Sequence, residues 1–252
     1  HMRDNIKILY RDGDIVIIEK QPGMSSEVDG SGEDAPTVAG RQCGCVCRSA
    51  HRLDKCTGGV IVLAASVRSA GPLSALFSQH AVEKHYIAAV SGTPEPSEGE
   101  MCDLLFHDRR CNKSFVVRRA RNGAKEAHLS YSLLDTTAVN GAQISLVSVQ
   151  LYTGRTHQIR VQFASRKLPL LGDKKYGSRD GGCKTALWCS DISFVHPFTG
   201  KAVAAHSDPP AVFPWSCFES CFERSDAQRA EECGLQSTKK YNTEEKQHDG
   251  MK

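Results

Sequence analysis

A polar loop with a single acidic side chain is the first place in the sequence where residue types and spacing indicate chemistry. Residues 51–59 read His-Arg-Leu-Asp-Lys-Cys-Thr-Gly-Gly, and the apolar run 60–65 follows at once. Enzymes tend to place a reactive side chain on a loop that a rigid strand holds in position. Asp54 is therefore our candidate for a catalytic residue. The alternative, which composition alone favours, is a solvated aspartate in a turn made by glycines.

A second segment combines a turn, a predicted helix start and several cations. Residues 153–164 read Thr-Gly-Arg-Thr-His-Gln-Ile-Arg-Val-Gln-Phe-Ala. Thr156 can cap a helix here, and the free N–H groups at a helix start bind anions. Arg155 adds a planar guanidinium that is suited to phosphate. Arg160 lies one turn further on and is expected to point elsewhere, toward the interior. The alternative is an amphipathic surface helix with solvated arginines.

The composition is that of a protein with a sizeable core and no strong charge bias. The chain has 252 residues, is 40% hydrophobic and carries a formal net charge of +3. This charge permits a nucleic-acid partner without requiring one, because local patches matter more than the total. No apolar run is long enough for a signal peptide or a membrane span. We therefore expect a cytoplasmic protein with no membrane partner, and take a monomer as the default because the sequence does not reveal the oligomeric state.

The 11 cysteines show no metal-binding signature. Cys43, Cys45 and Cys47 alternate along the chain, and a period of two places three small side chains on one face of a strand. Zinc sites usually show paired Cys-x-x-Cys knuckles or Cys/His pairs instead. Free thiols in a reducing compartment are the simplest interpretation, so we expect no metal site.

Local patterns predict several strands, the later ones antiparallel, and few helices. Asn-Gly pairs at 122–123 and 140–141 supply the turns between these later strands. Residues 25–36 are expected to form an exposed loop, residues 3–222 one domain, and the polar residues 223–252 a disordered tail. The predicted strands cover residues 6–10, 15–20, 60–65, 82–90, 113–119, 124–134, 141–152 and 186–194, and the predicted helices lie within 67–80 (starting near Pro72), 156–165 and 213–222.

The two segments, together with a strand between them, resemble the RluA-type family of pseudouridine synthases. Residues 51–65 match the family's first block, His-Arg-Leu-Asp followed by Thr-(Ser/Gly)-Gly and an apolar strand. Residues 84–88 match its Lys-x-Tyr-x-Ala strand, and residues 153–161 and 169–177 match its later blocks. The similarity covers roughly residues 6–215.

This resemblance implies both a fold and a reaction. The implied fold is α+β, with a central mixed, largely antiparallel sheet, flanking helices and a catalytic cleft. The implied reaction converts uridine to pseudouridine in RNA, with no metal or organic cofactor. The chain departs from the family pattern at Gln162, where many members carry histidine, and in the shifted proline of residues 20–23. We also expect a short form of the family, without an S4-like RNA-binding module.

The resemblance also implies roles for three side chains. Asp54 acts either as a nucleophile at the anomeric carbon or as a base at the neighbouring carbon in a glycal route, and the sequence leaves both routes open. Arg160 is the matched ion-pair partner that keeps Asp54 charged and aimed. Tyr86 presents a ring on which uracil can stack, and its hydroxyl could help to remove a proton from the new carbon–carbon bond.

The expected substrate is a stem-loop of ribosomal or transfer RNA, from which the target base must be flipped out. Arg52 is expected to fill the space that the base leaves. Arg155, His157, Lys174 and Lys175 are candidates for RNA contacts, although each lysine could equally be a solvated surface charge.

Two other functions fit part of the pattern. A catalytically silent RNA-binding module could use the same scaffold, but it would have no need of the set Asp54, Tyr86 and Arg160. A carboxylate-based glycosidase would need a second acid within about 5–10 Å of the first. No acidic residue in the matched blocks is an obvious candidate, and the sequence leaves Asp173 open.

Overall fold

The computed structural model describes residues 5–179 and 182–222. The chain divides into two units, residues 1–217 and 218–252, and the sheet belongs to the first. The tail predicted for residues 223–252 lies outside the described residues. No helix in the described part is long and apolar enough to span a membrane.

The described strands form one mixed sheet of 11 strands, in the order β1-β2-β4-β10-β5-β9-β8-β6-β7, with β11 paired to β10 and β3 to β4. All pairings are antiparallel except that of β4 with β10. The α+β class is therefore confirmed. The strands are β1 (Lys7–Arg11), β2 (Ile15–Lys20), β3 (Arg48–Ser49), β4 (Gly58–Ala64), β5 (Glu83–Ser91), β6 (Glu98–Asp108), β7 (Lys113–Val117), β8 (Ala124–Val139), β9 (Ala142–Leu151), β10 (Leu187–Val195) and β11 (Ala202–His206).

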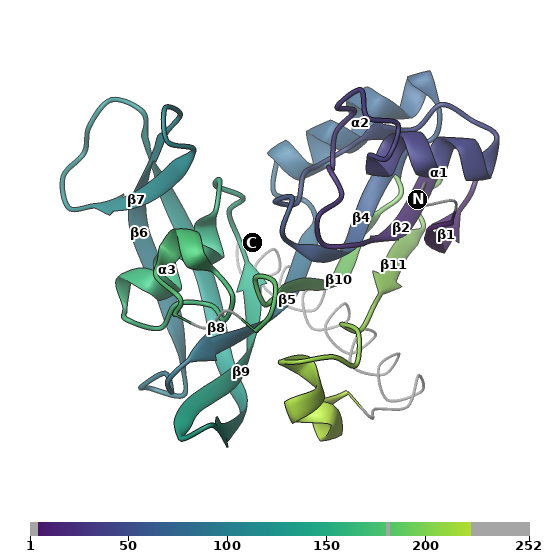
Figure 1. The fold of residues 1–252 in the computed structure, drawn as a ribbon. Coiled ribbons are helices and arrows are strands. Elements are labelled where there is room, and N and C mark those ends of the chain that lie inside the picture. Colours follow the sequence, from purple (N-terminus) through teal and green to yellow (C-terminus); the bar gives the residue numbers. More distant parts are fainter. Residues whose placement is uncertain (1–4, 180–181, 223–252) are drawn as a thin grey trace, which may run out of the picture. The chain divides into compact units, whose positions relative to one another are not determined.

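Few helices accompany this sheet, and they lie toward its two ends (Figure 1). The helix α1 (Ala35–Cys43) contacts β2, and α2 (Val67–Ser78) contacts β4. The helix α3 (Gln158–Ser165) packs against β6 and β7. Two 3-10 turns, η1 (Lys174–Tyr176) and η2 (Trp215–Cys221), complete the described elements. Every residue of β4 is buried, which accounts for the unbroken apolar run that follows the loop of Asp54.

The cysteine-rich segment forms a helix end and a turn, so the prediction of a strand there was wrong. Asp34 caps α1 by accepting a hydrogen bond from the backbone N–H of Thr37, and Gly44 ends the helix in the left-handed conformation. Cys43 therefore belongs to the last turn of α1. The thiols of Cys45 and Cys47 lie 3.7 Å apart in the following turn, and all three side chains are free.

The predicted start of the next helix was also wrong. The helix α2 begins at Val67, and Pro72 lies inside it. Ser66 and Ser69 form a reciprocal capping box at its N-terminus, which satisfies backbone N–H groups that would otherwise lack partners. The cap, rather than the proline, thus sets where α2 starts.

Two glycines let β4 approach β10 closely. A β-carbon on Gly58 would collide with the ring of Trp188, and one on Gly59 would collide with the backbone of Cys189. Gly59 also has φ +107°, a conformation that L-residues with side chains rarely adopt. This parallel contact anchors the C-terminal end of the loop that carries Asp54.

The substitution Gly59→Ala should therefore destabilise the fold. Combined backbone strain and overpacking should lower the free energy of unfolding by about 2–4 kcal/mol, measured by urea denaturation. Gly13→Ala is the matched control, because Gly13 lies in the turn between β1 and β2 with φ outside the left-handed region, and a β-carbon there would have nothing within 4 Å. It should change the free energy of unfolding by less than about 0.5 kcal/mol. Equal stability of the two variants would contradict the close β4–β10 contact.

Candidate active site

A cleft of about 1070 Å³ is lined by the loop before β4, by β5 and by the segment that leads into α3. The structure brings most of the predicted site residues together here. Lys174 is exposed and does not line the cleft. The lining includes Asp54, Tyr86, Arg160, Arg52, Arg155, His157 and Lys175.

The loop of Asp54 is fastened to the segment that follows β2. Ser26 Oγ donates to the carbonyl of Leu53 at 2.7 Å and accepts from the N–H of Leu53 at 3.1 Å. Gly23 N–H donates to the carbonyl of Lys55 at 2.7 Å. The backbone carbonyl of Asp54 closes a turn by accepting from the N–H of Thr57 at 2.9 Å. The carboxylate is thus held on a braced loop and remains 24% exposed toward the cleft.

Arg160 is held between two carboxylates. Its Nη1 donates to Asp54 Oδ2 at 2.9 Å, while Nε and Nη2 donate to the two oxygens of Asp173 at 2.6 and 2.8 Å. Burial alone would lower the pKa of Arg160, but the hydrogen bonds and charge of Asp173, with the charge of Asp54, raise it above its usual value. Arg160 therefore points inward, as expected, and stays charged.

Tyr176 supports this arrangement through its ring. The Arg160 Cζ lies 5.1 Å from the centroid of the Tyr176 ring. The Tyr176 hydroxyl accepts from the N–H of Ser114 at 2.8 Å and shares a hydrogen bond of 2.9 Å with Nδ1 of His157. Because Tyr176 and Asp173 both belong to the segment around η1, this segment fixes Arg160 by its charge and by its ring.

His157 occupies a position that the sequence did not predict. It is the N-cap of α3 with φ 55°, and no side chain caps the helix, so the expected Thr156 cap was wrong. The ring is buried beside the acid, with Nε2 3.8 Å from Asp54 Oδ2. Burial lowers the pKa of His157 to about 4. The ring is therefore neutral at pH 7 and contributes no positive charge.

Tyr86 lies in β5 with its side chain in the wall of the cleft. It is 6% exposed and pairs with Cys189 of β10 and Val149 of β9. Burial, aided by Cys189 and by the charge of Asp54, raises the pKa of Tyr86 well above its usual value. The hydroxyl is consequently protonated at neutral pH.

The cationic side chains at the rim of the cleft form only a few exposed hydrogen bonds and ion pairs within the protein. Arg52 Nη1 lies 3.2 Å from Glu27 Oε2, and both side chains are exposed. Arg155 Nε donates to the carbonyl of Glu126 at 2.7 Å, and Lys175 Nζ donates to a backbone carbonyl at 2.8 Å. Exposed contacts of this kind contribute little to stability, so these charges can exchange their partners for an incoming polyanion.

Comparison with known proteins decides the reaction class. Residues 14–165 match the model of a family described as RNA pseudouridylate synthase. The chain belongs to this family, in its RluA-type branch. It is 33% identical over 225 residues to an uncharacterized RNA pseudouridine synthase of Mycobacterium bovis, covering 82% of this chain and 70% of that protein. It is 30% identical over 201 residues to the dual-specificity RNA pseudouridine synthase RluA of Escherichia coli, covering 78% and 90%.

A solved structure agrees with this assignment at the level of the fold. The human protein RNA pseudouridylate synthase domain containing 1 superposes with a TM-score of 0.74 and 20% identity, covering 91% of this chain and 94% of that one. The sequence-based assignment to an RNA pseudouridine synthase is confirmed. The enzyme forms pseudouridine in RNA.

Several residues of the cleft were missed from the sequence. Lys84 and His51 line it beside the predicted residues, and Arg109 reaches it from the β6–β7 hairpin. Two signals were available. Lys84 and Tyr86 are two residues apart in one strand and so share a face. From Arg109 to Lys125 the sequence carries seven basic residues and no acidic one, which indicates a surface for a polyanion.

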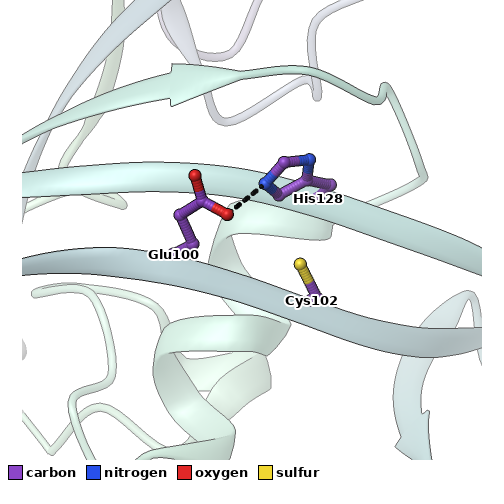
Figure 2. Close-up of side chains that lie close together, drawn as sticks. All are labelled: Glu100, Cys102 and His128. Carbon is purple, nitrogen blue, oxygen red and sulfur yellow. Dashed lines mark hydrogen bonds and ion pairs between the residues drawn. The ribbon is translucent and has the colours of Figure 1, made fainter.

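One set of possible metal ligands lies outside the cleft. Figure 2 shows Glu100 and Cys102 on β6 with His128 on β8. Their ligand atoms lie within 4.8 Å of one another, and Glu100 Oε2 is 3.0 Å from His128 Nε2. The Glu100 and Cys102 side chains are exposed, and the ion pair alone accounts for the proximity of the carboxylate and the ring. None of the three residues lines the cleft.

The ion pair of Arg160 with Asp173 should be more important for stability than any ion pair at the rim. Asp173→Asn leaves a buried guanidinium with only one carboxylate, so it should lower the free energy of unfolding by about 3–5 kcal/mol. Glu27→Gln breaks the exposed pair with Arg52 and should cost less than about 1 kcal/mol. Urea denaturation of both variants measures the difference, and similar values would show that Asp173 does not hold Arg160.

Proposed function

We propose that Asp54 is the catalytic residue and that the substrate is a stem-loop of ribosomal or transfer RNA. The observation that carries the proposal is the chain of contacts from Asp173 through Arg160 to Asp54. It supplies one partly exposed carboxylate in the cleft, and a buried, charged partner that orients it. A carboxylate held in this way is ready to react with a sugar without further rearrangement.

We propose that Oδ1 is the reacting oxygen of the Asp54 carboxylate. Arg160 binds Oδ2, and no described residue donates a hydrogen bond to Oδ1. Oδ1 can therefore attack the anomeric carbon of the target ribose, or remove the proton from the neighbouring carbon in the glycal route. In either route the glycosidic bond breaks, and its electron pair leaves with the uracil. The uracil then turns, and its carbon C5 bonds to the anomeric carbon. In the first route this breaks the bond to Asp54 Oδ1, and in the second the neighbouring carbon regains its proton from Asp54. The proton on C5 is lost last.

Tyr86 is proposed as the platform for the base. Its ring lies in the cleft wall and offers a flat surface for stacking. Because the raised pKa keeps the hydroxyl protonated, this group can take the proton from C5 only while it passes its own proton on. Tyr86 thus combines a binding role with a proton-relay role.

The rim residues are proposed to bind the RNA backbone around the flipped nucleotide. Arg155, Lys174 and Lys175 offer charge to phosphates. Arg52, two residues before Asp54, lines the cleft, and its proposed role is to fill the space left by the base. His157 is neutral, so it would contact RNA by hydrogen bonding and not by charge.

Asp54→Asn should abolish pseudouridine formation while leaving the affinity for RNA within about threefold, because the carboxylate takes part in the reaction and not in phosphate binding. Mapping pseudouridine across total RNA compares cells that carry the wild-type gene, Asp54→Asn, or no gene. Pseudouridine sites that are lost in cells without the gene identify the substrate, which we expect to be ribosomal or transfer RNA. Asp29→Asn, in an exposed loop, is the control and should retain every site. Retained turnover by Asp54→Asn would refute the assignment.

The two roles of Tyr86 can be separated. Tyr86→Phe keeps the ring, so RNA binding should persist while product formation slows by about 100-fold through loss of the proton relay. Tyr86→Leu removes both functions and should weaken binding as well. Single-turnover assays with saturating RNA give the rates, and filter binding gives the affinities. An unchanged rate for Tyr86→Phe would restrict this side chain to stacking.

A further inference from the structure

Lys84 is a buried cation without a partner among the described residues. The residue is 6% exposed and lines the cleft. Among residues 5–179 and 182–222, no group accepts a hydrogen bond or forms an ion pair with its amine. Burial lowers the pKa of Lys84, which reflects the cost of keeping a desolvated ammonium without an anion.

The other buried lysine shows what a structural role looks like in this protein. Lys20 is fully buried, and its Nζ donates to the carbonyl of Met24 at 2.9 Å and, at 3.4 Å, to those of Gln21 and Lys55. Its charge is thus satisfied by the backbone, and it ties the end of β2 to the loop of Asp54. Lys84 forms no comparable hydrogen bonds with described residues in the free enzyme, so its charge is available to a ligand.

The position of Lys84 relates it to the base and not to the RNA backbone. Lys84 and Tyr86 are alternate residues of β5 and are buried on the same face. The Lys84 amine also lies close to Gly154, since a β-carbon there would be 4.0 Å from Nζ. Lys84, Tyr86 and Gly154 all line the cleft, so the amine lies between the strand of the proposed stacking platform and the segment that leads to α3. The phosphates, in contrast, would meet the exposed cations of the rim.

No anionic side chain among the described residues pairs with the ammonium of Lys84. The nearby His51 is neutral, because burial lowers its pKa to about 3 and its Nε2 accepts a hydrogen bond from the N–H of Val62 at 3.1 Å. Thr57 also lines the cleft, and its buried hydroxyl has no hydrogen-bond partner among the described residues. An ammonium that lines the cleft without an anion indicates a place for an oxygen atom of a substrate.

We propose that Lys84 stabilises the uracil anion that forms when the glycosidic bond breaks, by placing its ammonium against a carbonyl oxygen of the base on Tyr86. The proposal rests on the reaction proposed above. The bond between N1 and the sugar breaks, and its electron pair spreads over N1 and the carbonyl oxygens of uracil. Lys84 keeps its proton throughout. A cation fixed where negative charge develops, in a site with little water, lowers the barrier without any reorganisation.

Replacing the charge should slow the reaction without weakening RNA binding. Lys84→Met should lower kcat by about 100-fold or more, the usual effect of removing one donor to a developing oxyanion, with KM and RNA affinity within about threefold of the wild type. Lys84→Arg, which keeps the charge, should recover at least about a tenth of the wild-type rate. The substrate is total RNA from cells that lack the gene, labelled with tritium at uracil C5, and tritium release measures turnover.

Stability separates this role from a structural one. Lys84→Met removes an unpaired buried charge, so its melting temperature should equal or exceed that of the wild type. Lys84→Gln retains the polarity without the charge, and should be as slow as Lys84→Met. Lys201→Met, an exposed lysine in the turn between β10 and β11, is the control and should match the wild type in rate and stability.

Three results would overturn the proposal. The first is a kcat of Lys84→Met within about threefold of the wild type, and the second is a Lys84→Arg variant as slow as Lys84→Met. The third is a loss confined to RNA affinity with a changed salt dependence, because this indicates a phosphate contact. If Lys84→Met fails to fold, Lys84→Gln decides by the same criteria. Asp54→Asn is assayed in parallel. Turnover by Asp54→Asn refutes the proposed catalytic residue, whereas an inactive Asp54→Asn beside a normal Lys84→Met refutes the role of Lys84 alone.

Discussion

One buried guanidinium connects the parts of the chain from which the cleft is built. Arg160 projects from α3 and contacts Asp54 in the loop before β4 and Asp173 in the segment before η1. Burying such a cation without partners costs several kcal/mol, so all three segments must reach their places together. The folding of the cleft and the orientation of the acid are therefore one process. The same contact commits both oxygens of Asp173, which is 1% exposed, and this removes it as the second acid of a glycosidase.

The central strands could be predicted because their signals are local. The apolar, β-branched residues of β2 and β4 define buried strands without help from the rest of the chain. Asp54, Tyr86 and Arg160 were identified as a set through the resemblance to a family, and the structure brings all three into one cleft. That they share a cleft depends on pairings such as β5 with β10, between strands that are distant in the sequence.

The errors arose where a weak local signal competed with a stronger one. Pro72 was taken for the start of α2. The helix starts earlier, where the capping box of Ser66 and Ser69 provides hydrogen-bond partners for the first backbone N–H groups. The short helix α1 follows a stretch rich in glycine, serine and aspartate, which conceals its Asp34 cap. The strand β6 was not predicted, because acidic and apolar residues share one of its faces: Asp103 lies between the buried Met101 and Leu105. The isolation of Lys84 follows from what surrounds it in space, which no local pattern encodes.

The charges of the cleft divide binding from chemistry. At the rim, exposed cations such as Arg52 and Lys175 have partners that a phosphate can replace, and we propose that they attract RNA through charge that salt screens. In the interior, Arg160 is balanced by two carboxylates, and His51 and His157 are neutral. Among the described residues that line the cleft, Lys84 is then the interior cation whose charge has no counterpart. The net charge of +3 for the whole chain does not reveal this division. What a charged side chain in the cleft can do depends on whether it is buried, and not on how many charges the chain carries.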